Sequence, residues 1–240
     1  MLFNVQSFTV PTSNRPNEDA FTFKLFSENE EKLVAAIADG VGGNVGGGVA
    51  SSTSVNLALE LLTNKTEYKL FQIFEFIKNN LIEISTQDTR LLKMATTLTL
   101  LVIEQYKVKF GHVGDTRLYH LRSSGLKQKT KDQTEVALLV EQGVITPRKA
   151  KNYPRKSVLI SALSASSDYS LQQGEFEIEP NDRLLLLSDG VYNVLPKRKI
   201  CDISLNSFTL LEFKENLINE LLLYELNDDA TLILIEVCES

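Results

Sequence analysis

The sequence predicts an α+β fold, and two observations carry that prediction. Short apolar or alternating segments gather in blocks near the start, the middle and the end of the 240-residue chain. Between these blocks stand longer segments whose apolar residues recur every three or four positions, as in helices with one buried face. Runs of strands followed by runs of helices are typical of α+β layering, whereas strict alternation would indicate βαβ units.

The composition is that of an ordinary globular protein. Hydrophobic residues make up 43% of the chain and charged residues 23%, which suffices for a sizeable core. The net charge is −6, and no stripe of Lys and Arg indicates nucleic-acid binding. The chain has no apolar run near the roughly 20 residues of a membrane span and no signal-peptide pattern at its start. Cys201 and Cys238 stand alone, so we expect reduced thiols in a soluble, cytoplasmic protein.

The first half of the chain contains two predicted blocks of strands with helices between them. Short apolar runs bounded by polar residues predict strands at 2–10, 20–26 and 33–38. Apolar spacings of three and four predict helices at 46–62 and 70–84. Four further strands joined by short polar turns indicate an antiparallel meander, at 98–105, 108–113, 118–121 and 126–129.

The second half predicts a helical excursion and a return to strands. Residues 135–157 have helical spacing, and Pro147 is well placed to begin a second short helix. The small polar stretch 161–170 is expected to be a surface excursion. The remaining elements are strands at 174–178, 183–187 and 230–237 and a helix at 210–224. No internal repeat divides the chain, so we expect one domain over residues 1–240.

The most informative feature is the position of Asp residues at strand edges. Four motifs share it: Asn17-Glu18-Asp19, Ala38-Asp39-Gly40-Val41-Gly42-Gly43, Ser188-Asp189-Gly190 and Asn227-Asp228-Asp229-Ala230-Thr231. A carboxylate just past a buried strand projects from the rim of a rigid sheet, and several rims can converge on one cleft. Hard cations such as Mg²⁺ and Mn²⁺ prefer this all-oxygen environment. One Asp-Gly pair is more simply a turn, but four acidic rims together indicate a metal site.

Glycine after Asp39 and Asp189 fits the same interpretation. A bare backbone permits a tight turn and lets a carbonyl oxygen approach a cation closely. The Gly40 carbonyl is therefore a candidate ligand.

Further motifs follow in a recognisable order. They are Met94-Ala95-Thr96-Thr97-Leu98, Val113-Gly114-Asp115-Thr116-Arg117, Thr130-Lys131-Asp132-Gln133-Thr134, Gly143-Val144-Ile145-Thr146-Pro147 and Asn152-Tyr153-Pro154. With the acidic motifs they cover nearly the whole chain, which resembles the metal-dependent protein phosphatases (the PPM or type 2C family), and especially their compact bacterial members. The resemblance implies two antiparallel sheets packed as a β-sandwich with helices on both faces (α-β-β-α), and a flap at about residues 133–170.

The resemblance also implies an activity and a ligand set. It implies a serine/threonine phosphoprotein phosphatase that hydrolyses phosphomonoesters with a hydroxide bridging two Mn²⁺ or Mg²⁺ ions. Asp39 is implied to bridge the ions. The other implied ligands, direct or through water, are Asp189 and Asp228 at one ion and the Gly40 carbonyl with Glu18 or Asp19 at the other.

Four positions either depart from the family pattern or allow a second interpretation. Arg15 is the candidate for binding the substrate phosphate, but in many relatives the arginine lies one residue further from the acidic pair, so a surface ion pair is the alternative. Asp132 matches a position that holds a third, looser ion, or else is an exposed loop residue. Val41 stands where many eukaryotic members have a histidine proposed as general acid. Asp229 replaces the usual Asn after the last ligand.

Two other functions remain open at this stage. A catalytically weak scaffold that binds a partner would keep the fold, and a phosphatase of small metabolites would use the same metal chemistry. Every core acidic position is filled, which favours the enzyme. As partners the family suggests phosphorylated Ser/Thr proteins, the targets of a Ser/Thr kinase in signal transduction. We expect a monomer that binds neither nucleic acid nor membrane.

Overall fold

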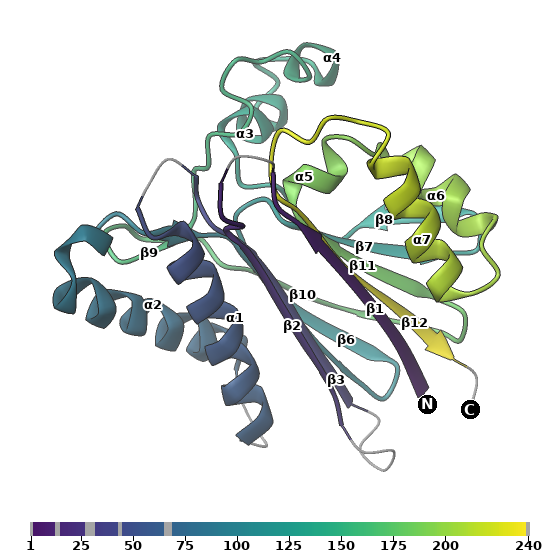
Figure 1. The fold of residues 1–240 in the computed structure, drawn as a ribbon, viewed down its shortest axis with the longest axis horizontal. Coiled ribbons are helices and arrows are strands. Elements are labelled where there is room, and N and C mark those ends of the chain that lie inside the picture. The colour runs from purple at the N-terminus through teal and green to yellow at the C-terminus, as the bar shows by residue number, and fades with distance from the viewer. Residues whose placement is uncertain (1, 13–14, 27–31, 43–44, 65–68, 239–240) are drawn as a thin grey trace.

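Two five-stranded antiparallel sheets pack against each other, and helices cover the outer face of each (Figure 1). The computed structural model describes residues 2–12, 15–26, 32–42, 45–64 and 69–238. Separate buried clusters lie between the sheets and beneath the helices on either side. The predicted α+β class and the implied α-β-β-α sandwich are therefore confirmed. No helix in the described part of the chain is both long and apolar enough to cross a membrane.

The first sheet lies beneath two long helices, α1 (Gly47–Asn64) and α2 (Leu70–Gln87). Its strand order is β10 (Gln172–Glu177), β6 (Lys107–Val113), β5 (Leu98–Glu104), β3 (Lys32–Asp39) and β2 (Asp19–Leu25). A short 3₁₀ helix, Thr89–Leu91, follows α2.

Strand β3 is continuously apolar because both of its faces are buried. Val34, Ala36 and Ala38 pack under the helices, whereas Leu33, Ala35 and Ile37 face the second sheet. A strand buried on both faces has no need of alternation. It therefore carries its terminal residue, Asp39, at the end of a rigid element.

The second sheet lies beneath shorter helices. Its order is β1 (Leu2–Val10), β12 (Ala230–Cys238), β11 (Arg183–Leu187), β7 (Arg117–Arg122) and β8 (Gly125–Gln128). Its outer face is covered by α5 (Asp189–Tyr192), α6 (Lys197–Leu205) and α7 (Leu210–Leu221). Thr209 is the N-cap of α7, and its hydroxyl accepts the Glu212 N–H at 3.1 Å. Helices α5 and α6 are additions to the predicted elements.

The predicted four-strand meander is wrong. Strands β5 and β6 pair in the first sheet, and β7 and β8 pair in the second. The chain crosses from one sheet to the other in the short turn at 114–116. Strand patterns and turn residues define the hairpins but carry no information about which sheet each joins. The crossing places Asp115 at the end of the sandwich where the acidic motifs also lie.

The flap stands above this end of the sandwich (Figure 1). The helical spacing predicted over 135–157 forms only two short helices, α3 (Glu135–Glu141) and α4 (Pro147–Ala150), and Pro147 begins the second as expected. Thr134 and Thr146 cap them by accepting N–H bonds at 3.2 and 3.4 Å. Beyond α4 the chain continues in turns.

The expectation of a surface excursion at 161–170 is only partly right. Residues 166–168 are exposed, but β9 (Leu163–Ser164) is buried and pairs with β4 (Ala95–Thr96). Small hydroxyl side chains tolerate this burial because they form local hydrogen bonds. The Ser161 Oγ accepts the Ser170 N–H at 2.9 Å, and the Ser164 Oγ accepts the Ser166 N–H at 3.1 Å.

Candidate metal centre

Five aspartates meet at one rim of the sandwich. Asp19 begins β2 and Asp39 ends β3, and the two are paired in register. Asp189 follows β11 and Asp228 precedes β12, while Asp115 follows β6. Antiparallel neighbours begin where their partners end, so residues far apart in sequence reach the same edge. The charges of the other four all act on Asp39, and we refer to these five residues as the acidic cluster.

Burial dominates the electrostatics of the acidic cluster. It raises the pKa of Asp39 well above its ordinary range, with the neighbouring carboxylates adding to the effect. Burial likewise raises the pKa of Asp19 to about 8, that of Asp115 to about 7 and that of Asp189 to about 6. Asp228 adds to the rise at Asp189, whereas the positive charge of nearby residues opposes it. These groups keep their protons to higher pH than ordinary carboxylates because several like charges share one desolvated space.

Two oxygens of the acidic cluster point to a cation. Within the described residues, Asp19 Oδ2 and Asp189 Oδ1 are buried without a hydrogen-bond partner. Such orphaned acceptors are costly, and a bound cation would satisfy them. The donor set is all oxygen, as hard divalent ions prefer. The residues present therefore fit Mg²⁺ or Mn²⁺.

The Thr96-Thr97 pair fixes the backbone of Asp39. The Thr97 Oγ1 accepts the Asp39 N–H at 2.9 Å, and the Thr97 N–H donates to the Asp39 carbonyl at 2.8 Å. The Thr96 hydroxyl donates to the same carbonyl at 2.9 Å. The Thr-Thr pair of the motif at 94–98 thus holds the backbone of Asp39 in a fixed position.

The glycines beside the aspartates serve close packing. A Cβ on Gly40 would lie 2.5 Å from the carbonyl carbon of Gly47, the first residue of α1. A Cβ on Gly190 would lie 2.1 Å from the Asp229 carbonyl oxygen. The sequence predicted that these glycines permit tight turns. In the structure, Gly40 and Gly190 are needed because another segment of the chain packs directly against each of them. Gly190 in particular lets the turn of Asp189 approach that of Asp228. The Gly40 carbonyl as a ligand stays a prediction, and Gly43 of the same motif lies outside the described residues.

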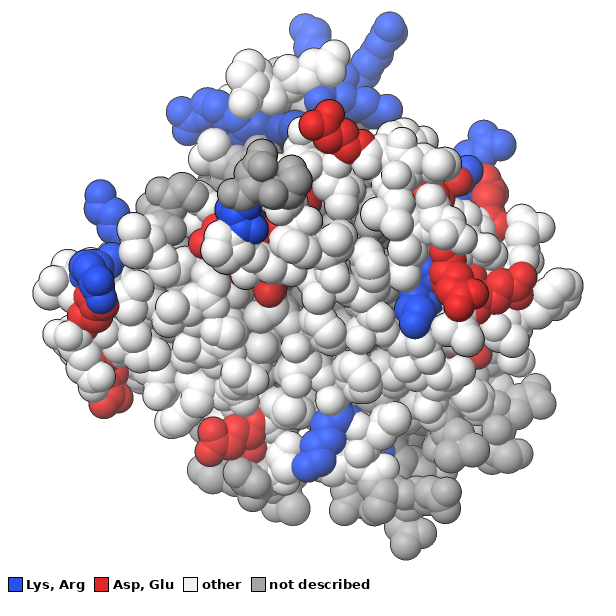
Figure 2. Space-filling view, viewed as in Figure 1, with Lys and Arg blue, Asp and Glu red and all other residues white. Residues whose placement is uncertain are grey.

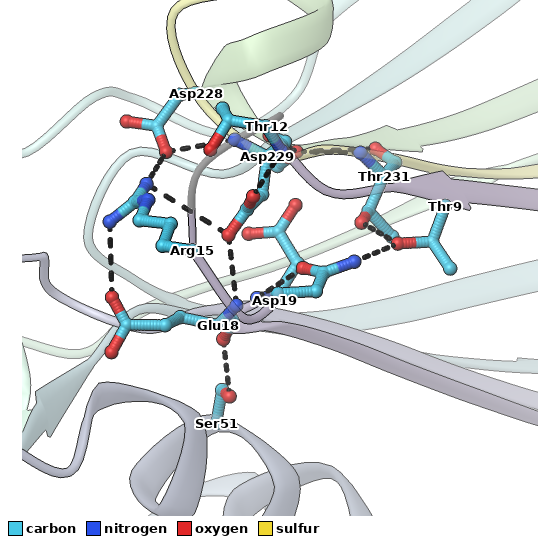
Figure 3. Close-up of polar contacts among 11 residues, drawn as sticks. Thr9, Thr12, Arg15, Glu18, Asp19, Ser51, Asp228, Asp229 and Thr231 are labelled. Carbon is cyan, nitrogen blue, oxygen red and sulfur yellow. Dashed lines mark hydrogen bonds and ion pairs between the residues drawn. The ribbon is translucent and has the colours of Figure 1, made fainter.

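Arg15 lies beside the acidic cluster (Figure 3). It donates to Glu18 Oε2 at 3.1 Å and forms a short ion pair with Asp228, while its distance to Asp229 Oδ2 is 3.9 Å. The Arg15 side chain is 34% exposed and that of Asp228 41%, so the pair lies at the exposed edge of the acidic cluster and the alternative of a surface ion pair stays open. Among the described residues, no three acidic side chains are already arranged to hold one ion between them. Arg15 instead occupies the place between two predicted ligands, Glu18 and Asp228.

Asp229 fastens the loop that carries Arg15. One carboxylate oxygen accepts the Thr12 N–H and the other accepts the Glu18 N–H, each at 2.8 Å (Figure 3). The residue is 2% exposed. Arg15 therefore lies near both adjacent acids, but only Asp229 accepts the backbone N–H groups of Thr12 and Glu18.

Asp132 is engaged by an arginine. Arg117 forms a two-pronged ion pair with its carboxylate, with Nε–Oδ1 at 3.0 Å and Nη2–Oδ2 at 2.6 Å, and Gln128 donates to Oδ1 at 2.8 Å. The Arg117 guanidinium lies 3.5 Å from the centre of the Tyr192 ring. The Tyr192 hydroxyl donates to Asp115 at 3.1 Å. A chain of contacts therefore links Asp132 to the acidic cluster.

Three residues of this region were not predicted as functional. Asp115, Arg117 and Tyr192 line one groove with Asp132 and Asp189. Asp115 follows a buried strand, as the other acidic motifs do, and this signal could have identified it. Tyr192 lies on a helix that the sequence did not predict.

Known proteins resemble the chain in sequence and in structure. The protein phosphatase 2C family matches residues 11–222. The serine/threonine phosphatase stp of Listeria monocytogenes is 29% identical over 220 residues, covering 88% of this chain and 87% of the relative. Protein phosphatase PhpP of Streptococcus pneumoniae is 29% identical over 193 residues, or 78% of each chain.

Solved structures give the same result. The serine/threonine phosphatase PstP/Ppp of Mycobacterium tuberculosis superposes with a TM-score of 0.87 at 26% identity, covering 100% of both chains. The catalytic domain of PstP in complex with two manganese ions superposes with a TM-score of 0.81 at 26% identity over 99% of both chains.

The sandwich, the acidic cluster at its rim and these likenesses define the class as a metal-dependent serine/threonine protein phosphatase. The chain belongs to the protein phosphatase 2C family.

Proposed function

We propose that the acidic cluster holds two tightly bound Mn²⁺ or Mg²⁺ ions, at which the protein hydrolyses phosphoserine and phosphothreonine in other proteins. The observation that carries this proposal is the burial of four carboxylates at one rim, those of Asp19, Asp39, Asp115 and Asp189. Two of them, Asp19 and Asp189, have an oxygen without a hydrogen-bond partner. Buried acids of like charge are stable in their ionised form only next to positive charge. When bound, divalent cations activate water and neutralise charge on phosphoryl oxygens.

Asp39 is the proposed bridging ligand, because its charge is coupled to every other member of the acidic cluster. Asp189 and Asp228 would complete one site. The Gly40 carbonyl and Glu18 or Asp19 would serve the other. Thr97 forms hydrogen bonds with both the N–H and the carbonyl of Asp39. Because the backbone is fixed in this way, the Asp39 carboxylate needs little reorganisation to bind an ion.

Arg15 is the proposed phosphate-binding residue. Its guanidinium offers paired donors that match phosphate oxygens, and it lies beside Asp228. An ion at Asp228 would compete with the guanidinium for that carboxylate, and a guanidinium displaced from it would have its N–H groups free for the substrate. The same movement would therefore open one metal site and prepare the phosphate site.

Asp132 is proposed to hold a third, looser ion. Its ion pair with Arg117 must first open, which explains in physical terms why such an ion would bind weakly. Asp132→Ala should slow turnover while two ions remain tightly bound, as counted by titration calorimetry with Mn²⁺. Loss of all metal binding would contradict this division.

The proposed setting is a single catalytic domain over residues 1–240, with residues 133–170 as its flap. We propose a cytoplasmic monomer that acts on the targets of a Ser/Thr kinase in signal transduction. Its two free thiols, Cys201 and Cys238, support a reducing compartment.

The experiment is hydrolysis of an aryl phosphate with and without Mn²⁺, repeated with Asp39→Asn and then with phosphothreonine peptides. Asp39→Asn should abolish the metal-dependent rate, whereas Asp202→Asn, an exposed site on α6, should leave it unchanged. Absence of any metal-dependent rate in the wild type would refute the enzyme and revive the scaffold alternative. Turnover of the aryl phosphate and of small metabolites, but of no phosphopeptide, would favour the metabolite phosphatase.

A further inference from the structure

The flap carries a concentration of positive charge. Between Glu141 and Asp168 the sequence has no acidic residue, but it contains Arg148, Lys149, Lys151, Arg155 and Lys156. The chain as a whole has a net charge of −6, so this segment has the opposite sign to its surroundings. Figure 2 shows basic side chains gathered over the flap at the top of the molecule.

Most of this charge has no internal partner. Arg155 is engaged by Glu135, with bonds of 2.9 and 2.6 Å. For Arg148, Lys149, Lys151 and Lys156, the described part of the chain supplies no ion pair, although basic residues elsewhere commonly have one. Their charge is therefore available to a bound ligand, and that of Lys156 already reaches the acidic cluster, where it opposes the rise in the pKa of Asp189.

Two of these lysines line the groove that leads to the acidic cluster. A cavity of about 930 Å³ is bounded by Asp115, Asp132 and Asp189 and by Lys151 and Lys156 of the flap. A phosphorylated side chain at the acidic cluster would leave the adjacent residues of its peptide within this groove. Those residues would then meet the two lysine ammonium groups.

Charge complementarity identifies the residues that would fit. Lysine ammonium groups attract carboxylates, and such surface complementarity acts on association and on selectivity. A nucleic acid could meet the same lysines, but its backbone would also approach the carboxylates that line the groove, which would repel it. With the proposed cations bound, the single phosphate of a short acidic peptide would meet positive charge at the acidic cluster, and its flanking carboxylates would meet the two lysines.

We propose that Lys151 and Lys156 select substrates with acidic residues next to the phosphorylated Ser or Thr. The proposal rests on the proposed phosphatase function and adds the substrate class. Each lysine should contribute up to about fivefold in kcat/KM, as expected of an exposed ion pair. The preference should weaken at high salt, because exposed charges are screened.

The test compares two phosphothreonine peptides of equal length that differ only in having Glu or Gln on either side of the phosphorylated residue. The measured quantity is the ratio of kcat/KM for the two peptides, which cancels any change in turnover common to both. The wild type should favour the Glu peptide, and Lys151→Ala/Lys156→Ala should bring the ratio close to one. Lys24→Ala/Lys109→Ala removes the same charge from exposed sites along β2 and β6 and should keep the wild-type ratio.

The outcomes separate this inference from the proposed function. Hydrolysis of both peptides at equal kcat/KM by the wild type would overturn the selectivity while leaving the phosphatase intact. A preference that survives in Lys151→Ala/Lys156→Ala, or that disappears equally in the control variant, would also overturn it. Failure of the wild type to hydrolyse even an aryl phosphate with Mn²⁺ would instead refute the underlying activity.

Discussion

Replacing Asp229 with Asn tests whether its negative charge is needed by the loop that carries Arg15. The two carboxylate oxygens of Asp229 accept N–H bonds from Thr12 and Glu18, each at 2.8 Å. Asn has one acceptor oxygen and one NH₂ group, so it can accept only one of these bonds. The other N–H would then face a donor inside a site where the residue is 2% exposed.

The loss of one hydrogen bond determines how far the free energy of unfolding should fall. A hydrogen bond to a charged acceptor contributes about 1.5–3 kcal/mol to the free energy of unfolding, which corresponds to roughly 3–6 °C of melting temperature for a chain of this size. Relief of repulsion with Asp19 is the opposing effect. It is small in metal-free protein at neutral pH, because Asp19, with its pKa raised to about 8 by burial, is then mostly protonated. The loss of the hydrogen bond should therefore outweigh the relief of repulsion, and Asp229→Asn should lower the stability of the metal-free protein.

The assay is thermal unfolding of metal-free Asp229→Asn in chelator at pH 7, followed by phosphopeptide kinetics with saturating Mn²⁺. We expect a lower melting temperature and a higher KM, because the loosened loop positions Arg15 less well. Asp202→Asn, on the surface of α6, serves as the control for removal of one charge. An unchanged melting temperature together with an unchanged KM would refute the role assigned to Asp229, and would mean that the Asn usual in the family serves equally well here.

Three further predictions follow from the same rim. Burial raises the pKa of Asp115 to about 7 and that of Asp19 to about 8, so the folded metal-free protein holds more protons than the unfolded chain between the ordinary Asp pKa of about 4 and these values. Its melting temperature should therefore fall as the pH rises through this range towards 8; saturating Mn²⁺ should remove the decline, and a flat metal-free profile would contradict it. Arg15→Ala should raise the phosphopeptide KM about tenfold, through loss of charge-assisted bonds, while tightening Mn²⁺ binding in calorimetry; an unchanged KM removes the phosphate-binding assignment. Gly190→Ala, with its Cβ 2.1 Å from a backbone oxygen, should cost about 2 kcal/mol or more in urea unfolding, whereas Gly125→Ala, with 3.4 Å of space, should cost little.

The sequence predicted most strands and the long helices because their patterns are local. The spacing of Ile73, Phe74, Ile77 and Leu81 in α2 produces one buried face, and this periodicity is visible without the fold. The position of Asp39 after an apolar strand was equally local. Such signals need no knowledge of what packs against them.

Features that depend on partners across the fold could not be predicted. The crossing at 114–116 was mistaken for part of a meander, because a turn does not reveal which sheet the next strand joins. The burial of Leu163 and Ser164 depends on pairing with β4, which is distant in sequence. The engagement of Asp132 by Arg117 and the insertion of Arg15 between Glu18 and Asp228 are likewise tertiary contacts.

The distribution of the acidic cluster between the two sheets has a mechanical consequence. Asp19 and Asp39 belong to strands of one sheet, whereas Asp189 and Asp228 flank strands of the other. Cations bound by carboxylates of both sheets would crosslink the two layers at one end of the sandwich. Between the sheets the layers are otherwise held by apolar packing. Metal loading should then resist separation of the layers at that end, in addition to supporting catalysis. Amide hydrogen exchange at the start of β12 should therefore slow on metal binding, more than exchange at the far ends of the same strands.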